Sequence, residues 1–302
     1  RRVLLRSNVD ADTLDTVNKI NRLTSQIAAI NQHFRAGNGA SQDAGLDAQL
    51  HDSLEQLAGL VNVSLVRTDS GAAQVYIAGQ TPLVVEDKSF PIQADQSGSQ
   101  TRILDATGKD VTQVVTGGQL GSLVDEKNRV IPGYLSDLST LASTFADQVN
   151  GGLAAGLDSN GNPPTKGLFQ YHNSSDAAFT LSVTNITPAE IAAASVNSPG
   201  GNGNAIAMSQ LSTARVVNGF TFTQYFGQLG GRVGRDLLDA KQNQSQYQDL
   251  LNQTRQLRTA QTGVSLDAEA AKLLQYQQAY SAVGKLISIL SDLTQVILSA
   301  VH

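Results

Sequence analysis

The last forty residues of the chain read GVSLDAEAAKLLQYQQAYSAVGKLISILSDLTQVILSAVH (Gly263–His302), with no proline and one interior glycine, Gly284. Residues of one stripe recur every seven positions: Leu266, Leu273, Tyr280, Ile287, Thr294 and Val301. Others fall near the midpoints of these steps: Ala270, Val283, Leu290 and Ile297. This spacing predicts a long helix with a coiled-coil-like seam. Ser265 can cap the start of that helix.

The second half of this helix carries another apolar stripe beside the first, made of Leu286, Ile289, Leu293 and Val296. A helix that is apolar over most of its girth needs partners on several sides. Lys285 and Asp292 interrupt the run, so we expect no membrane insertion. Two interpretations stay open: a buried core helix of a monomer, or a terminal helix that orders only when neighbouring subunits enclose it. For the second, the assembly interface would be Leu266, Leu273, Tyr280, Ile287, Leu290, Ile297 and Val301.

Composition limits the classes of function. A chain of 302 residues can hold one large domain or two ordinary ones. The net charge is -5 and the pI is about 5.3, so a nucleic-acid partner is not expected. Charged residues make up only 16% of the chain, which leaves a surface rich in uncharged polar side chains. The absence of cysteine from the sequence excludes disulfides, thiolate metal sites and a cysteine nucleophile.

The N-terminal third changes its hydrophobic period twice. Apolar residues at helical spacing predict a helix from about Asp12 to Phe34, with Leu14 on its apolar face. The polar, glycine-rich stretch 36–45 ends it, and a second helix over 46–60 completes an antiparallel hairpin. From Val61 short alternating runs predict a small antiparallel sheet, with Pro82 and Pro91 at edges or turns.

A glycine-rich stretch, 117–121, marks the return to helix, which we expect over 122–150 with Pro132 near a kink or helix start. Its apolar face is predicted from Leu135, Leu138, Leu141, Phe145 and Val149. Residues 179–184 are typical of a strand, and 188–191 of a short helix. From Ala205 we expect helix to the end, with breaks at 227–234 and at Gly263.

The fold class predicted is mainly α with a small β component (α+β), in which long antiparallel helices pack in a coiled-coil-like manner. We expect a helical hairpin over 1–60 that pairs with the C-terminal helices, a small β-rich subdomain over 61–116, and a helical return with its loop over 117–169. A reduced outer β and loop region follows over 170–204. The C-terminal helices occupy 205–302, with 263–302 as the terminal assembly helix.

No catalytic or cofactor-binding constellation stands out in the sequence. The four histidines, His33, His51, His172 and His302, lack the spacing of metal ligands. Asp158-Ser-Asn-Gly161 looks like part of a calcium loop, but Phe169 occupies the position where a bidentate glutamate belongs, so we interpret it as a turn. The glycine-rich stretch 227–234 lacks the spacing of nucleotide loops. We therefore expect no enzyme activity, cofactor or metal.

Two long segments resemble a known family. The first is GGQLGSLVDEKNRVIPGYLSDLSTLASTFADQVN (Gly117–Asn150), and the second is TGVSLDAEAAKLLQYQQAY (Thr262–Tyr280). Together they resemble the first hook-associated protein of bacterial flagella, which forms part of the hook–filament junction. The resemblance runs from about Val17 to the end of the chain. The stretch 170–204 is short where larger members carry an outward-facing β domain.

This resemblance implies a non-enzymatic subunit, secreted to the bacterial flagellum, that self-assembles and adapts hook to filament. The implied partners are copies of itself, neighbouring hook and junction or filament proteins, and an export chaperone. The chain opens with Arg1 rather than Met, and we expect the family's N-terminal helix and export signal to be missing before it. Two alternatives remain: another axial protein of flagellin, hook or rod type, or an adhesin or enzyme built on axial-protein ends.

Overall fold

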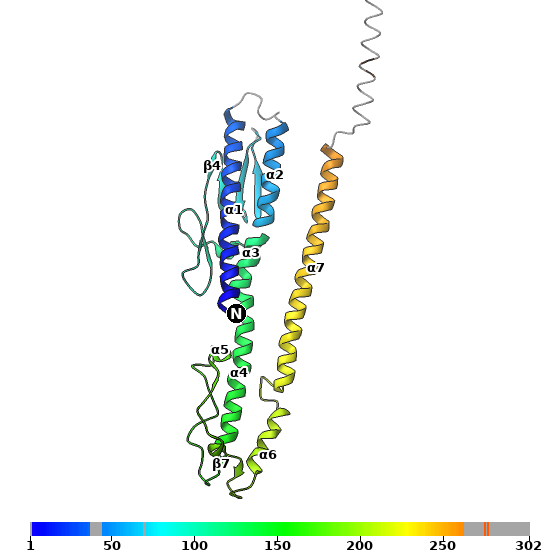
Figure 1. Cartoon of the computed structure of the whole chain (residues 1–302). Helices are drawn as coiled ribbons and strands as arrows, with labels where there is room; N and C mark the ends of the chain where they lie inside the picture. Colours follow the sequence, from blue (N-terminus) through cyan, green and yellow to red (C-terminus); the bar gives the residue numbers. More distant parts are fainter. Residues whose placement is uncertain (1, 37–43, 69–70, 263–274, 276, 278–302) are drawn as a thin grey trace, which may run out of the picture. The chain divides into compact units, whose positions relative to one another are not determined.

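The computed structural model of the chain describes residues 2–36, 44–68, 71–262, 275 and 277 (Figure 1). The chain divides into two compact units, Arg1–Leu229 and Gly230–His302. Its described part is mainly helical with small antiparallel sheets, as the sequence predicts. The assembly residues predicted in the terminal helix lie outside the described residues: Leu266, Leu273, Tyr280, Ile287, Leu290, Ile297 and Val301.

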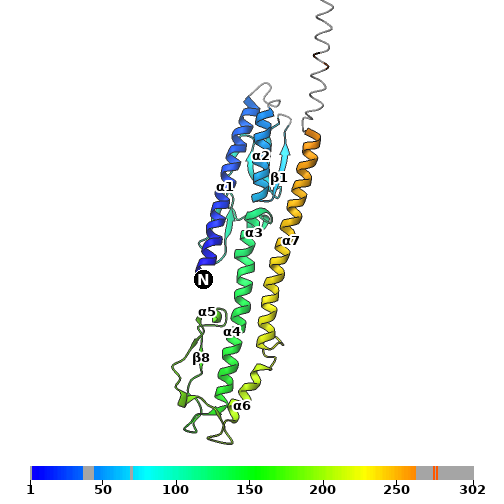
Figure 2. The ribbon, with the colours of Figure 1, turned by 45° about the vertical axis from the view of Figure 1, so that its right-hand side comes forward.

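The predicted helical hairpin is confirmed by α1 (Arg2–Ala36) and α2 (Ala44–Leu60), which pack side by side (Figures 1 and 2). Helix α1 begins well before the predicted start. The prediction for Leu14 is wrong, because its side chain is 44% exposed. Thr13 and Thr16 are buried instead. Their hydroxyls donate to the carbonyl oxygens of Val9 and Asp12, each at 2.7 Å, so neither buried oxygen lacks a partner.

The predicted sheet is also present. Its strands β1 (Val63–Arg67), β2 (Ala73–Ile77), β3 (Thr81–Val85) and β4 (Lys88–Ser89) pair antiparallel in that order. A separate hairpin pairs β5 (Gln93–Asp95) with β6 (Arg102–Leu104), and a short 3-10 turn, η2 (Thr112–Val114), follows.

Pro82 differs from the expectation, because it lies inside β3 rather than at a boundary. Strand β4 pairs only with Val84 and Val85, so at Pro82 nothing on that side requires a backbone N–H.

The main hydrophobic core lies between the hairpin and the sheet. Alternating apolar side chains of β2 and β3 meet the apolar stripes of α1 and α2. Its largest fully buried side chains are Ile20, Ile27, Leu50, Leu57, Ile77, Leu83, Ile92, Ile103 and Leu120. Each such side chain contributes about 1.5–3 kcal/mol of burial free energy. The buried amide of Asn31 joins α1 to the sheet, since it exchanges 2.8 Å hydrogen bonds with the backbone N–H and C=O of Ala73.

The helical return forms as α3 (Gly118–Asp125), a π turn η3 (Glu126–Val130) and α4 (Ile131–Ala154). Pro132 occupies the first turn of α4, as predicted for a helix start. Of the predicted apolar face of α4 only Val149 is buried, whereas Leu135, Leu138 and Leu141 are half-buried and Phe145 is exposed. The buried positions are Ser139, Ser143, Ala146, Val149 and Leu153.

The region after α4 is built of short elements. Strand β7 (Gly156–Leu157) pairs with β10 (Ala194–Ser195), and β8 (Phe169–Gln170) pairs with β9 (Ser182–Val183). Between them lie α5 (Ala177–Thr180) and the 3-10 turn η4 (Pro188–Glu190), and α6 (Gly203–Ser209) and η5 (Gln210–Ser212) follow. The predicted strand over 179–184 is wrong in its first half, because Phe179 and Thr180 close α5.

Helix α7 (Phe222–Thr262) runs through the glycine-rich stretch 227–234 without the predicted break. The break lies earlier, where Val217 and Phe220 bridge each other across Asn218 and Gly219. Both turn residues have positive φ, 50° and 83°, which is the conformation an Asn-Gly hairpin turn supplies.

Candidate assembly surface

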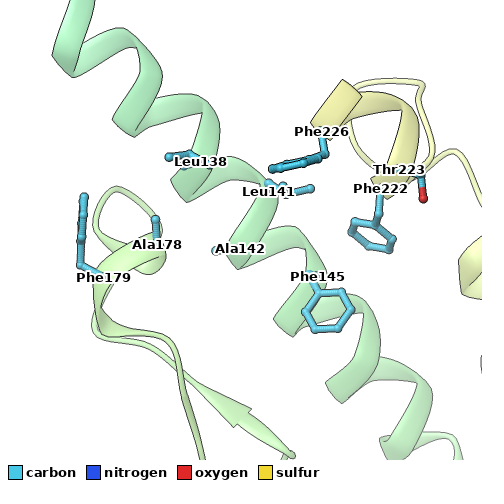
Figure 3. Close-up of a pocket in the computed structure, with 9 residues that line it drawn as sticks. All are labelled: Leu138, Leu141, Ala142, Phe145, Ala178, Phe179, Phe222, Thr223 and Phe226. Carbon is cyan, nitrogen blue, oxygen red and sulfur yellow. The ribbon is translucent and has the colours of Figure 1, made fainter. Parts of the chain in front are cut away.

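An open apolar groove lies along α4, on the face that the sequence predicts to be buried. Its volume is about 630 Å³. Figure 3 shows the side chains that line it, which come from α4, α5 and the start of α7. They are Leu138, Leu141, Ala142, Phe145, Ala178, Phe179, Phe222, Thr223 and Phe226. No lining side chain carries a charge, so the groove suits aliphatic or aromatic groups.

Aromatic contacts join the walls of this groove. The ring of Phe145 on α4 lies 5.4 Å from that of Phe222 on α7, at 83°, an edge-to-face arrangement. The ring of Phe145 also lies 5.3 Å from that of Phe169 of β8, at 53°. Edge-to-face pairs of this kind add about 0.5–1.5 kcal/mol beyond burial. Phe226, which also lines the groove, is 61% exposed, so the groove presents apolar surface to solvent.

Small residues explain the burial of three positions of α4 that lie beside the groove. Ser139, Ser143 and Ala146 are nearly inaccessible. Short side chains let neighbouring backbone approach a helix closely, and the Ser139 hydroxyl accepts a hydrogen bond from the backbone N–H of Ala178 at 3.5 Å. The larger apolar side chains of α4 therefore point to the groove.

Polar contacts hold the segment that contains Phe169 and Tyr171 against α4. The Asn150 amide donates to the backbone C=O of Phe169 at 2.8 Å and accepts from its N–H at 3.0 Å. The Tyr171 hydroxyl donates to both carboxylate oxygens of Asp147, at 2.9 and 3.0 Å. This hydrogen bond raises the pKa of Tyr171. The motif residue Asn150 thus holds in place one of the aromatic residues that contact Phe145.

A second hydrophobic cluster lies beyond the groove, at the end of α4. It contains Val149, Leu153 and Ala192. The buried Asn204 amide donates to the carbonyl oxygens of Gly152 and Ala192, at 3.0 and 2.6 Å. These contacts close the outer region onto the last turns of α4.

The second unit presents an apolar face of its own on α7. Its exposed large hydrophobic side chains are Val233, Leu237, Leu238, Tyr247, Leu250 and Leu251. Val233, Leu237 and Tyr247 lie at helical spacing, and Tyr247 is 73% exposed. A row of exposed apolar side chains along one helix is typical of a surface that another helix covers.

His51 and His172 contact neighbouring polar side chains, and the Asp158 loop forms a turn. His51 lies 3.2 Å from an Arg67 nitrogen, and His172 lies 3.0 Å from an oxygen of Asp176. His33 is exposed, and His302 lies outside the described residues. Asp158 accepts from the backbone N–H groups of Asn160 and Asn162, each at 2.8 Å, which confirms the predicted turn. Across the described ranges, no group of three or more histidine and acidic side chains is placed to hold a metal.

Among the described helices, none combines the length and the apolar character needed to cross a bilayer.

Comparison with known proteins gives a family. The model of the "Flagellar hook-associated protein FlgK helical domain" matches residues 3–169, more than half of the chain. The match includes the hairpin, the sheet, and the whole of the Gly117–Asn150 motif.

Two curated relatives agree with this match. The chain is 22% identical to "Flagellar hook-associated protein 1" of Bacillus subtilis over 335 aligned positions, which cover 96% of this chain and 65% of that protein. It is 29% identical to the protein of the same name in Escherichia coli over 160 positions, 48% of this chain and 29% of that protein. The chain therefore spans less than two thirds of the length of either relative.

Among solved structures, the chain is similar to the flagellar hook junction protein FlgK from Burkholderia pseudomallei. The TM-score is 0.49 and the sequence identity 29%, over 56% of this chain and 32% of that one. On the strength of the match over residues 3–169, the chain belongs to the FlgK family of flagellar hook-associated proteins.

Proposed function

We propose that this chain is a structural subunit of the bacterial flagellum that self-assembles at the hook–filament junction and adapts hook to filament. The observation that carries the proposal is the family match over residues 3–169. Both curated relatives are named flagellar hook-associated protein 1. Family membership favours this function over the alternatives of a flagellin, a hook or rod protein, or an adhesin or enzyme on axial-protein ends.

The surfaces of the molecule support an assembling protein. The α4 groove offers uncharged apolar walls, and α7 exposes Val233, Leu237 and Tyr247 along one face. Contacts that repeat head to tail without closing generate a helical array, as a tubular junction requires. The terminal stripe from Leu266 to Val301 would add a third apolar surface, and we retain it as part of the proposed assembly interface.

The partners that fit these surfaces are further copies of the chain and the neighbouring hook and filament proteins. We also propose that an export chaperone binds the chain before export. The chain is then secreted from the cell and takes an extracellular position at the junction. We also propose a purely structural role without enzyme activity, nucleic-acid binding or membrane insertion. We further propose that the subunit divides into subdomains at the boundaries 60/61, 116/117, 169/170 and 204/205.

Immunogold electron microscopy of isolated flagella tests the proposal. An antibody against the chain should label a short zone between hook and filament. A strain that lacks the gene serves as the control for antibody specificity. Label distributed along the filament or along the hook would identify a different axial protein. Label confined to the cell body would overturn the flagellar assignment.

A further inference from the structure

Two hydrophobic clusters of the first unit are joined through one helical passage. Along the chain, the main core ends at Val124 and the second cluster begins at Val149. Between them the chain passes through the π turn η3 and the first half of α4. This passage is the place where motion of one cluster relative to the other would have to be absorbed.

The backbone of this passage has three features that weaken a helix. Glu126–Val130 forms a π turn, a rare form with i→i+5 hydrogen bonds that interrupts the regular pattern of an α-helix. Pro132 follows the π turn after Ile131 and lacks a backbone N–H. Gly133 comes next, and glycine restricts the backbone least of all residues. Kinks and bends in helices concentrate at such residues.

The near side of the passage is firmly held by the main core. Lys127 donates to both carboxylate oxygens of Asp10 on α1, at 2.6 and 2.7 Å. Asn128 exchanges two 2.8 Å hydrogen bonds with the backbone of Thr101, just before β6. Consecutive side chains of the π turn thus reach two different elements. The side chains of Lys127 and Asn128 therefore hold the first half of the π turn to the elements of the main core.

The far side is held by the second cluster. Within the described part of the chain, the elements that α4 packs against most extensively are η3, α5, α6, β7 and β8. These belong to the π turn itself or follow α4 in the sequence. Residues 131–138 are mostly half-buried, and the buried face of α4 starts only at Ser139.

We propose that Glu126–Gly133 is a built-in hinge between the two hydrophobic clusters. Lys127 and Asn128 fix the first half of this segment to the main core, and bending is permitted after them, at Pro132 and Gly133, where the π turn passes into α4. The hinge lies inside the region that the family model matches rather than at its edge. It rests on the geometry of this unit alone. For a subunit placed between two different neighbours, it would let one set of contacts adjust while the other is kept.

The cysteine-free sequence allows a direct test by site-directed spin labelling. Ala48→Cys on α2 and Gly151→Cys on α4 place labels at exposed positions on opposite sides of the hinge. Ala48→Cys with Ala11→Cys on α1 is the control pair on the same side. Distances are measured by double electron–electron resonance on labelled protein diluted with an excess of unlabelled protein, so that only distances within one chain contribute.

The hinge predicts a distance distribution across Glu126–Gly133 about twice as wide as that of the control pair. Pro132→Ala combined with Gly133→Ala should narrow the distribution across the hinge without changing the control pair. Gly59→Ala, at a helical glycine with nothing within 4 Å of the added carbon, is the matched substitution and should leave both unchanged. Circular dichroism confirms that each variant is folded. Equal widths in the two pairs, or a width that the Pro132 and Gly133 substitutions do not alter, would overturn the proposal.

Discussion

Lys127 and Asp10 form an ion pair between residues 117 positions apart in the sequence, with Nζ 2.6 Å from one carboxylate oxygen and 2.7 Å from the other. The Lys127 side chain is only 7% exposed and that of Asp10 is 29% exposed. A lysine is rarely buried unless it is paired. The pair therefore fixes the π turn of the Gly117–Asn150 motif to α1.

Removing the ammonium should destabilise the protein. Lys127→Met leaves the Asp10 carboxylate without its partner in a partly buried site. We expect the free energy of unfolding to fall by about 2 kcal/mol, less than for a fully buried pair because Asp10 keeps some contact with water. Urea denaturation at neutral pH measures the change.

The matched control is the exposed pair of Lys19 and Asp15, 2.8 Å apart within α1. Lys19→Met should leave the unfolding midpoint unchanged within error, since exposed pairs contribute little. The double variant Asp10→Asn with Lys127→Met should recover part of the lost stability. Equal effects of Lys127→Met and Lys19→Met would show that burial of the first pair has no energetic consequence.

Gly118 should not tolerate a side chain. Its φ is +69°, and an added Cβ would lie 2.4 Å from the backbone nitrogen of Val61 and 2.5 Å from the carbonyl carbon of Leu60. Gly118→Ala should therefore cost more than the roughly 1–2 kcal/mol of a left-handed conformation, because the end of α2 must also move. Gly108 also has positive φ, +84°, but nothing lies within 4 Å of its added carbon. Gly108→Ala should show the conformational cost alone, and a thermal melt of both variants compares them.

Glu190 should titrate far below an ordinary glutamate. Hydrogen bonds from the Thr187 backbone N–H and hydroxyl, at 2.7 and 2.8 Å, and from Lys166 lower its pKa from 4.5 to about 2. Because the pKa is lower in the folded state, the stabilisation is fully present above pH 4.5 and is lost as the pH falls toward about 2.

Carboxyl carbon NMR shifts report this titration directly. Lys166→Met should raise the midpoint of Glu190, and Thr187→Ala should also raise it by removing the hydroxyl donor. A midpoint near 4.5 in the unmodified protein would mean that the hydrogen bonds to Glu190 do not persist in solution.

The apolar face of α7 should drive association. Leu237→Asp and Tyr247→Asp place a charge on side chains that are 56% and 73% exposed in the single chain. Burying one large apolar side chain contributes about 1.5–3 kcal/mol, so each substitution should weaken association about tenfold or more. Gln242→Asp, on an exposed position of the same helix, controls for added charge. Sedimentation velocity follows association, and an unchanged association constant would remove this face from the interface.

A charge placed on the terminal apolar stripe, which runs from Leu266 to Val301, should also weaken association. Ile287→Asp or Leu290→Asp should weaken assembly while barely changing the melting of the core formed by residues before Thr262. Collapse of the monomer by either substitution, together with strong amide protection beyond Gly284, would instead assign this segment to a monomeric core.

The sequence predicts best the elements whose apolar residues all face the main hydrophobic core, because their spacing then follows the period of the helix or strand. The spacing of Ile20, Ile27, Leu50 and Leu57 predicts the α1–α2 hairpin, and alternation predicts β2 and β3, because these faces all meet in one cluster.

On α4 the same spacing predicts the buried position Val149 but not the buried positions Ser139, Ser143 and Ala146. Ser139 and Ser143 are buried because short side chains allow close packing, whereas Leu138 and Phe145 line the open groove. The spacing of hydrophobic residues alone cannot distinguish a helix face that is buried in the core from one that lines an exposed apolar groove. The aromatic residues Phe179, Phe222 and Phe226 are not predicted as groove residues. Phe179 reaches the groove on α5, whereas Phe222 and Phe226 reach it on α7, directly after the turn at Asn218-Gly219. That Asn-Gly pair was the available signal.

Electron microscopy of cells that lack this gene tests the central claim most directly. A subunit that adapts hook to filament is required for filament growth but not for the hook beneath it. The mutant cells should carry complete hooks without filaments, and expression of the intact gene should restore them. Normal filaments on the mutant cells, or loss of the hooks as well, would contradict a role at the hook–filament junction.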